Sequence, residues 1–416
     1  MDVILKTGQR SEHAEVKDDL IANILMPKDM PKDPDEEAVL QEAFLHPVGT
    51  PCLRDIVRPH ETVAIVTSDI TRPCPSYRIL PLVLKELHEA GVRDEDITIL
   101  FGRGSHRSQS KEEMIHIVGK DVYERIRCAD TDFEDTVHYG TTERGTPVDI
   151  DRRVAKADRR ILIGNVEYHY FAGFSGGAKA LMPGASTPQA IQANHRLMTD
   201  PAACTGRLEG NPVREDIEEA AEMVGADFIV NVVLNTDKKI VYAAAGDMHD
   251  AHRRACAYLD ERYACPIGEK ADIVLVSQGG APKDINLYQT QKALDNAGHA
   301  VKDNGTVILV GSCREGYGNP VFENWMKKYD DPQDMINAIH RQFRLGGHKA
   351  AAIAMIRARA EIFLVSDMAE DETKGTMLKR YASLEEAYEA AQKKYGGKGT
   401  VIIMPYGGST LPKVKE

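Results

Sequence analysis

The sequence predicts an α/β fold with two domains, each built on a mostly parallel sheet flanked by helices. Short runs rich in β-branched residues recur along the chain, and longer amphipathic stretches separate them. This alternation is typical of parallel strands joined by crossover helices. The chain has 416 residues, more than one hydrophobic core usually organises, so we expect two domains.

The β-branched runs predict the strands, in chain order 62–67, 97–101, 160–165, 272–277, 305–310, 361–366 and 400–404. The amphipathic stretches predict the crossover helices, among them 75–92, 111–126 and 214–225. Before them, the chain opens with a strand, followed by an acidic, proline-rich surface loop at 27–39 and the start of a helix. This N-terminal region carries no evident chemistry.

A short linker with proline and glycine, CPIGEKAD at 265–272, separates a helical stretch at 248–264 from a new strand. We therefore predict that residues 1–265 form an N-terminal, cofactor-binding α/β domain. Residues 266–416 are predicted to form a C-terminal α/β domain that contributes substrate-binding residues. The last residues have the option of packing back onto the N-terminal domain. We expect the active site in the interdomain cleft.

Composition argues against several classes of protein. The seven cysteines are odd in number, scattered and free of any CxxC pair, which argues against a disulfide framework and a thiolate zinc site. The start of the chain lacks a secretory signal pattern, and no apolar run approaches the roughly 18 residues that cross a bilayer. A net charge of −12 offers no attraction to nucleic acid or to an anionic membrane. We expect a soluble, cytoplasmic protein.

Ligands of open α/β sheets bind outside the carboxyl ends of the strands, so the segments that follow the strands are the candidate site. After strand 62–67, Asp69 and Arg72 lie on a turn restricted by prolines. They form either a surface ion pair or part of a binding site. After strand 97–101, His106 lies on a glycine-bearing loop and is either a solvated side chain or a catalytic group.

The strongest local signal follows strand 160–165, in VEYHYFAGFSGGAKALMPG. Ser175, Gly176 and Gly177 precede a predicted helix start and can direct backbone N–H groups toward a phosphate. The glycine spacing matches neither GxxxxGK[ST] nor GxGxxG, which disfavours a nucleoside triphosphatase. Lys179 is either a solvent-facing helical lysine or a group that meets a phosphate or a carbonyl carbon.

Two histidines flank this turn. His169 and Phe171 share one side of an extended segment by side-chain alternation, with Tyr170 on the other, which predicts a base beside an aromatic wall. His195 lies on a helix that begins with the Thr-Pro pair at 187–188. A helical histidine alone is usually structural.

In the second half, glycines follow a predicted strand, and a helix starts near Asn286. Gln289 and Lys292, three residues apart, share a helical face and either grip one carboxylate or are ordinary surface residues. His348 and Lys349 lie in a glycine-rich stretch and receive no role. The sequence has no HExxH motif and no carboxylate cluster with metal spacing, which disfavours the common metal-dependent hydrolases.

Five motifs in chain order, DITRP, GSHR, HYFAGFSGGAK, ANH and YQTQK, resemble those of the nickel-dependent lactate racemase family of 2-hydroxyacid racemases and epimerases. The resemblance spans most of the chain. The spacings, ten residues from His169 to Lys179 and sixteen from Lys179 to His195, agree with the family pattern. The resemblance implies an isomerase that inverts C2 of a 2-hydroxy acid by proton-coupled hydride transfer to a nickel-pincer nucleotide.

The resemblance also implies roles for the chemical groups. The cofactor is pyridinium-3,5-bisthiocarboxylic acid mononucleotide nickel, attached covalently at Lys179, with His195 as a nickel ligand. His106 and His169 are the implied acid–base pair, and two bases suit two enantiomers whose hydroxyls point differently.

Further residues are implied to line the same site. The remaining cofactor-binding groups are Asp69, Ser175, Gly176 and Gly177. The groups implied to bind or enclose the substrate are Arg72, Phe171, Tyr288, Gln289 and Lys292. The implied partners are a small-molecule 2-hydroxy acid and the separate enzymes that mature the cofactor.

One departure from the family concerns tryptophan. The family carries a tryptophan in the second half near the cofactor, whereas the only tryptophan here, Trp325, lies outside that region. The corresponding stretch, GGHKAAAIA at 346–354, has small residues. A smaller wall predicts a substrate bulkier than lactate, such as malate, a longer 2-hydroxy acid or an aldonate.

Two other interpretations stay open. One is an NAD-dependent hydroxyacid dehydrogenase, which fits the α/β pattern and the histidines, although the GxGxxG loop with its downstream acidic residue is absent from the sequence. The other is a non-catalytic protein that binds nucleotides or anions through the SGG turn alone. Turnover that depends on added NAD would favour the dehydrogenase. Ligand affinity without any activity would favour the binding protein.

Overall fold

The computed structural model describes residues 1–415 and separates into two compact units. Unit 1 comprises Met1–Lys28 together with the chain from Arg262 onward, and unit 2 comprises Asp29–Glu261. Each unit contains a mostly parallel sheet with helices beside it, so the predicted α/β fold class is confirmed. None of the helices in residues 1–415 combines the length and apolar character needed to cross a lipid bilayer.

Residues 1–28 belong to unit 1, which differs from the prediction that placed them in the N-terminal domain. The physical reason is strand pairing. β3 (Ile21–Ile24) runs parallel to β19 (Val401–Met404), near the other end of the chain. The hairpin of β1 (Asp2–Thr7) and β2 (Arg10–Glu15) buries its apolar side chains in the same core as the unit 1 sheet.

Unit 2 is built on a six-stranded sheet in the order β13-β12-β9-β4-β5-β6. Only the edge strand β13 is antiparallel to its neighbour. The strands are β4 (Val63–Ser68), β5 (Ile97–Gly102), β6 (Arg127–Asp130), β9 (Arg159–Asn165), β12 (Phe228–Leu234) and β13 (Ile240–Gly246). The three strands predicted in this region are confirmed as β4, β5 and β9.

Helices lie on both faces of the unit 2 sheet. Buried residues of α1 to α4 pack against one face, and the segment that carries Lys179 contacts β9 and β4. The helices are α1 (Glu36–Leu45), α2 (Leu53–Ile56), α3 (Ser76–Glu89), α4 (Lys111–Val118), α5 (Lys120–Arg125), α6 (Arg152–Lys156), α7 (Pro188–His195), α8 (Pro212–Val224) and α9 (Asp250–Tyr263). The helix predicted over 111–126 is two helices, because Gly119 adopts a φ of 87° between α4 and α5.

Short elements complete unit 2. Two antiparallel hairpins are formed by β7 (Thr136–Thr141) with β8 (Pro147–Asp151) and by β10 (Tyr168–His169) with β11 (Gly173–Phe174). The short 3₁₀ turns are η2 (Asp94–Asp96), η3 (Gly177–Ala180) and η4 (Arg196–Thr199).

Unit 1 contains a six-stranded, all-parallel sheet in the order β18-β17-β16-β15-β19-β3. Its further strands are β15 (Ala271–Ser277), β16 (Val301–Val310), β17 (Glu361–Val365) and β18 (Lys379–Tyr381). The four strands predicted in the second half are therefore confirmed. A separate pair, β14 (Ala264–Ile267) with β20 (Leu411–Val414), keeps the C-terminal strand within this unit.

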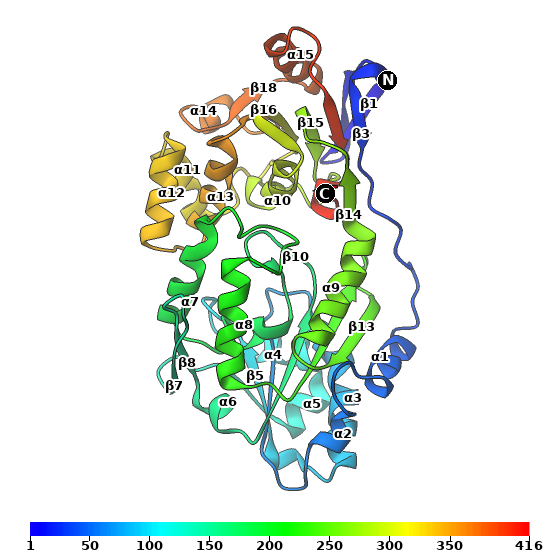
Figure 1. The fold of residues 1–416 in the computed structure, drawn as a ribbon, viewed down its shortest axis with the longest axis vertical. Coiled ribbons are helices and arrows are strands. Elements are labelled where there is room, and N and C mark those ends of the chain that lie inside the picture. Colours follow the sequence, from blue (N-terminus) through cyan, green and yellow to red (C-terminus); the bar gives the residue numbers. More distant parts are fainter. Residues whose placement is uncertain (416) are drawn as a thin grey trace. The chain divides into compact units, whose positions relative to one another are not determined.

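The helices of unit 1 cover both faces of its sheet. α15, with the β1–β2 hairpin, packs on one face through alternate residues of the strands, and α10 and α13 contact the sheet from the other side (Figure 1). The helices and 3₁₀ turns are α10 (Leu287–Gly298), α11 (Pro320–Lys328), α12 (Pro332–Arg341), α13 (Gly347–Arg357), α14 (Glu370–Thr373), α15 (Leu384–Lys394), η1 (Asp18–Leu20) and η5 (Gly407–Ser409).

Candidate active site

Three predicted site segments leave neighbouring strands of the unit 2 sheet. β9, β4 and β5 are adjacent and parallel, so their carboxyl ends lie at the same end of the sheet. The turn after β4 carries Asp69 and Arg72, the loop after β5 carries His106, and the segment after β9 runs from His169 to Lys179. The topology thus gathers residues that lie far apart in the sequence.

His106 is held by a buried carboxylate. Asp69 is 3% exposed, and its Oδ2 lies 2.6 Å from His106 Nδ1. Thr71 donates its hydroxyl to Asp69 Oδ1 at 2.7 Å. Because a carboxylate only accepts hydrogen bonds, Nδ1 carries the hydrogen and Nε2 of a neutral His106 carries the lone pair. The contact observed for Asp69, predicted as a cofactor-binding residue, is therefore with a predicted catalytic residue.

The turn at Ser175–Gly177 is packed so closely that its glycines cannot be replaced without strain. Gly176 and Gly177 have φ angles of 76° and 58°. A Cβ atom on Gly176 would lie 2.6 Å from Asn231 Oδ1, and one on Gly177 would lie 2.8 Å from His252 Cγ. Side chains of β12 and α9 therefore fix the turn that precedes Lys179.

Some backbone groups of this turn are already hydrogen-bonded within the protein. Asn231 Oδ1 accepts from the Gly177 N–H at 2.9 Å, and the Glu167 carbonyl accepts from the Ser175 N–H at 2.9 Å. His252 donates Nε2–H to the Ser175 carbonyl at 2.8 Å. Asn231 Nδ2 is buried and has no hydrogen-bond partner among the described residues. Two of the N–H groups predicted to face a phosphate are thus engaged elsewhere.

Lys179 lies in η3 with its ammonium group near an aromatic ring. Its Nζ is 5.7 Å from the centre of the Phe171 ring. Burial lowers the pKa of Lys179 well below its ordinary value of 10.5, and the charges of Arg214 and Arg72 lower it further. The side chain is therefore shifted toward its neutral, nucleophilic amine form.

Arg214 of α8 is a buried cation behind the same segment. It is fully buried and donates from Nε to the Ala172 carbonyl at 3.1 Å and from Nη2 to the Phe174 carbonyl. Its Nη1 lies 3.8 Å from Glu218 Oε1. Arg214 thus fixes the backbone between His169 and the glycine turn and adds positive charge there.

His169 lies at the end of β10, where the chain turns. The predicted extended segment stops there, so Tyr170 is not on the far side: its ring stacks on His169 at 5.5 Å, while Phe171 contacts His169 edge-on at 4.5 Å. His169 Nδ1 accepts from the Ala172 N–H at 3.3 Å. Burial lowers the pKa of His169 well below 6.5, and the Lys179 and Arg72 charges act in the same direction.

His195 is the last residue of α7. Thr187 begins that helix, as predicted, with its Oγ1 accepting from the Ala190 N–H at 3.3 Å. His195 is 8% exposed, and its ring centre lies 5.0 Å from that of Phe171. The centre of the Phe171 ring therefore lies 4.5 Å from that of His169, 5.0 Å from that of His195 and 5.7 Å from Lys179 Nζ.

The remaining predicted site residues lie in unit 1, on the first turns of α10. Asn286 begins this helix by accepting from the Gln289 N–H at 3.0 Å. Lys349 of α13 donates to the Tyr288 carbonyl at 2.7 Å, with its Nζ 4.3 Å from the Tyr288 ring centre. Lys292, one turn along, is exposed.

The single tryptophan packs where the sequence suggested open space. A Cβ atom on Gly347, at the start of α13, would lie 2.6 Å from Cε2 of Trp325 on α11. The indole thus fills the volume that a larger side chain at position 347 would take. The small residues of 346–354 do not leave an open wall at that position.

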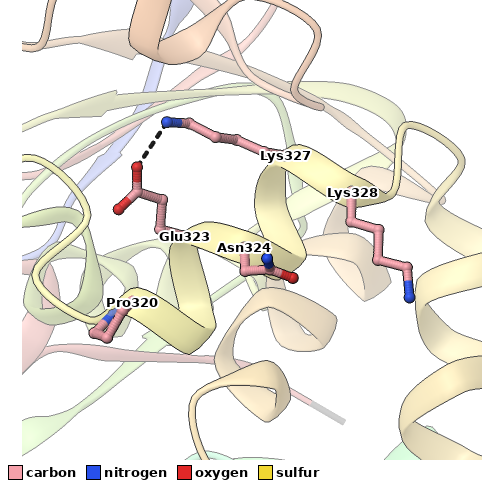
Figure 2. A pocket seen from close by; sticks show the side chains of 5 residues that line it. All are labelled: Pro320, Glu323, Asn324, Lys327 and Lys328. Carbon is pink, nitrogen blue, oxygen red and sulfur yellow. Dashed lines mark hydrogen bonds and ion pairs between the residues drawn. The ribbon is translucent and has the colours of Figure 1, made fainter.

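A pocket on unit 1 has none of these residues in its lining. Figure 2 shows its side chains projecting from α11: Pro320, Glu323, Asn324, Lys327 and Lys328. Lys327 donates to Glu323 Oε1 at 2.6 Å, an ordinary exposed pair one helical turn apart. Its lining consists of exposed or half-buried side chains of one helix and contains no buried nucleophile, so it is not the candidate site.

Comparisons with known proteins identify the family of this chain. The family model described as "Lactate racemase N-terminal domain" matches residues 7–206, and the "Lactate racemase C-terminal domain" matches residues 268–411. The chain belongs to the lactate racemase family. It is therefore an isomerase of the racemase type, as the motifs implied.

Individual members of the family are similar over most of their length. The lactate racemase of Thermoanaerobacterium thermosaccharolyticum is 33% identical over 390 residues, covering 91% of each chain. That of Lactiplantibacillus plantarum is 33% identical over 388 residues, again covering 91% of each. The apoprotein structure of the Thermoanaerobacterium enzyme covers 100% of both chains with a TM-score of 0.87 and 32% identity. A Thermotoga maritima protein, 19% identical with a TM-score of 0.63 over 93% of this chain, shares the fold.

Replacing Asp69 with asparagine is expected to reduce kcat for racemisation by about 10²-fold or more, with little change in KM. An amide can turn its NH₂ group toward His106 Nδ1, which would move the ring hydrogen to Nε2 and remove the lone pair that a base needs. Initial rates of lactate racemisation by the loaded enzyme measure the effect. A rise in KM alone, with kcat unchanged, would contradict this role.

Several contacts in the site could not be read from the motifs. Asn231 and His252 hold the glycine turn, and Arg214 holds the segment before it, yet all three follow the turn by more than thirty residues in the sequence. Asn194, in contrast, directly precedes His195 in the ANH motif, so its nearness to that histidine could be read from the sequence.

Proposed function

We propose that this protein is a racemase of 2-hydroxy acids that carries a nickel-pincer nucleotide on Lys179. The observation that carries this proposal is the contact of one aromatic ring, Phe171, with His169, His195 and Lys179. A lysine of lowered pKa that shares an aromatic neighbour with two imidazoles suits covalent attachment of an organic group beside a metal ligand.

The residues present fit that cofactor. Among residues 1–415 there is no group of three or more histidine, cysteine, aspartate or glutamate side chains arranged to hold a metal ion. A nickel ion held by His195 would therefore draw its other ligands from the bound organic group. His195 and Lys179 would hold the cofactor, with Asp69 and the Ser175–Gly177 turn nearby. When bound, the cofactor supplies a hydride acceptor for the α-hydrogen of the substrate.

The protein side of the mechanism is proton transfer at the substrate hydroxyl. We propose that His106 takes the hydroxyl proton of one enantiomer at Nε2, with Asp69 stabilising the imidazolium that forms. His169 would return the proton from Nε2 as an imidazolium, and since an imidazolium carries hydrogen on both ring nitrogens, its Nδ1 would first have to release the Ala172 N–H. For the opposite enantiomer the two roles exchange: a neutral His169 takes the hydroxyl proton at Nε2, and the His106 imidazolium returns it.

Substrate binding is proposed to use the groups that the family resemblance implies. Arg72, exposed beside Asp69, would pair with the substrate carboxylate, since guanidinium binds carboxylates in a bidentate fork. Phe171 would exclude water beside the reacting carbon. Tyr288, Gln289 and Lys292 of α10 are proposed as the further substrate-binding groups. The proposed partners are the 2-hydroxy acid and the cofactor-maturation enzymes, and the proposed location is the cytoplasm.

A panel of 2-hydroxy acids tests the function. Protein co-expressed with maturation enzymes and supplied with nickel should gain mass at Lys179 and should racemise lactate or a larger acid, such as malate or an aldonate. A clear preference for lactate over all larger acids would contradict the proposal of a larger substrate. The packing of Trp325 on Gly347 already removes open space at that position, which weakens the argument for a larger substrate. Activity that depends on added NAD, or ligand binding without turnover, would overturn the racemase mechanism.

A further inference from the structure

Asn194 directly precedes His195 at the end of α7 and is completely buried. Its Oδ1 lies 2.9 Å from His195 Nδ1. Neither the acid–base chemistry nor cofactor attachment assigns this amide a role. A buried amide beside a proposed metal ligand raises the question of which way round the amide lies.

Hydrogen bonds at the other end of the amide settle its orientation. Asn194 Nδ2 donates to the Val213 carbonyl at 3.2 Å and to Asp216 Oδ2 at 2.7 Å. Both partners can only accept, so the NH₂ group must face them and Oδ1 must face His195. An amide oxygen also only accepts. The hydrogen of a neutral His195 is therefore on Nδ1, and the lone pair is on Nε2.

Asp216 is itself fixed from two further elements. It is fully buried on α8 and accepts hydroxyl hydrogen bonds from Thr146, at 2.7 Å, and from Thr142. The two threonines face each other at the turn of the β7–β8 hairpin, where the Thr142 N–H donates to the Thr146 carbonyl at 2.9 Å. The amide orientation is thus determined by α7, α8 and this hairpin together.

We propose that Asn194 is a positioning residue for nickel binding: it holds His195 in the Nδ1–H tautomer and so leaves Nε2 to ligate the metal. This inference rests on the proposed role of His195 as a nickel ligand. Histidines that ligate metals generally donate their other ring N–H to an acceptor, and loss of that acceptor costs about 10- to 100-fold in metal affinity. Here the acceptor is an amide oxygen, and Asp216 orients that amide.

The tautomer can be measured without the cofactor. In ¹⁵N-histidine-labelled apoprotein at about pH 8.5, where an ordinary imidazole is neutral, ¹⁵N shifts distinguish the ring nitrogen that carries hydrogen from the one that does not. The His195→Gln spectrum assigns the signals. We expect His195 to be wholly Nδ1–H in the native protein and to show the Nε2–H form in Asn194→Ala. A native mixture, or an unchanged tautomer in Asn194→Ala, would overturn the proposal.

Three further variants guard against simple unfolding. Asn194→Ser keeps a hydroxyl that can donate to Asp216 but removes the acceptor near His195, so it should show the same tautomer change. The exchange Asn194→Asp with Asp216→Asn keeps the charge count, restores an acceptor facing His195 and should restore the Nδ1–H form. Asn235→Ala, a buried asparagine that caps a distant turn, should leave the His195 signals unchanged. Failure of the exchange to restore the tautomer would contradict the orientation argument.

Nickel content separates this inference from the proposed function. In protein matured with nickel, Asn194→Ala should acquire the Lys179 adduct at the native level but bind nickel about 10- to 100-fold more weakly in competition with a chelator. Native nickel retention in Asn194→Ala would overturn the positioning role. Absence of the adduct from the native protein would overturn the proposed function, while the apoprotein spectra would still decide whether Asn194 sets the tautomer.

Discussion

Lys179→Ala is expected to abolish covalent cofactor attachment and to lower the racemisation rate by at least about 10³-fold. The buried amine is shifted toward its neutral form by desolvation and by two arginines, and no methyl group can replace it as a nucleophile. Intact-mass spectrometry after maturation, together with initial rates in both directions, measures both effects.

Two comparisons make this result specific. Lys179→Arg restores a positive charge without a nucleophilic amine, so it should lack the adduct as completely as the alanine variant. Lys120→Ala removes an exposed lysine of α5 that pairs with Glu124 one helical turn away, and it should carry the native adduct. An adduct that persists in Lys179→Ala, or that maps to another residue, would contradict the tether.

His169→Asn and His106→Asn are each expected to lower kcat by about 10²- to 10⁴-fold. Each racemisation needs one group that takes the hydroxyl proton and one that returns it on the other face, so neither histidine alone suffices. Because two enantiomers have equal free energy, each variant must lower kcat/KM in the two directions by the same factor. Unequal factors would show a kinetic artefact, and a variant with native rates would remove that histidine from the acid–base pair.

The protonation state of His169 provides a separate check. Burial lowers its pKa, so in the folded apoprotein it should stay neutral as pH falls through 6.5 and should gain its proton only at lower pH. An NMR titration of the His169 ring measures this. The same sign applies to stability: below pH 6.5 the unfolded chain binds this proton and the folded chain does not, so His169 contributes a loss of folding stability as pH decreases. Titration at or above 6.5 would contradict the burial argument.

Local patterns predicted the central strands well, because each is a short β-branched run whose signal does not depend on its partners. β12 has an equally clear run, FIVNVVL, and the prediction missed it, whereas the alanine-rich β13, IVYAAAG, has a weak strand signal. The assignment of residues 1–28 failed for a different reason. β3 has only four residues, of alternating exposure, and nothing in them indicates a partner 380 positions away.

The site residues likewise divide into those that local sequence reveals and those that only the folded sheet brings together. His169, Lys179 and His195 stand in one segment, so their motif could be recognised as a unit, and the helix cap at Thr187 follows from its sequence. Asp69 and His106 each appeared as separate loop residues. Their contact exists because β4 and β5 are neighbours in the sheet, and strand order is a tertiary property that local sequence does not encode.

The parallel pairing of β3 with β19 has a consequence for biosynthesis. Unit 2 is one uninterrupted stretch, and all its strands are synthesised before the last third of the chain. Unit 1, by contrast, holds strands from both ends of the chain, and β3 has no partner until residues 401–404 emerge. A nascent chain or a truncation that stops short of those residues would present β3 and the open edge of β15 as unpaired backbone, the feature that favours aggregation.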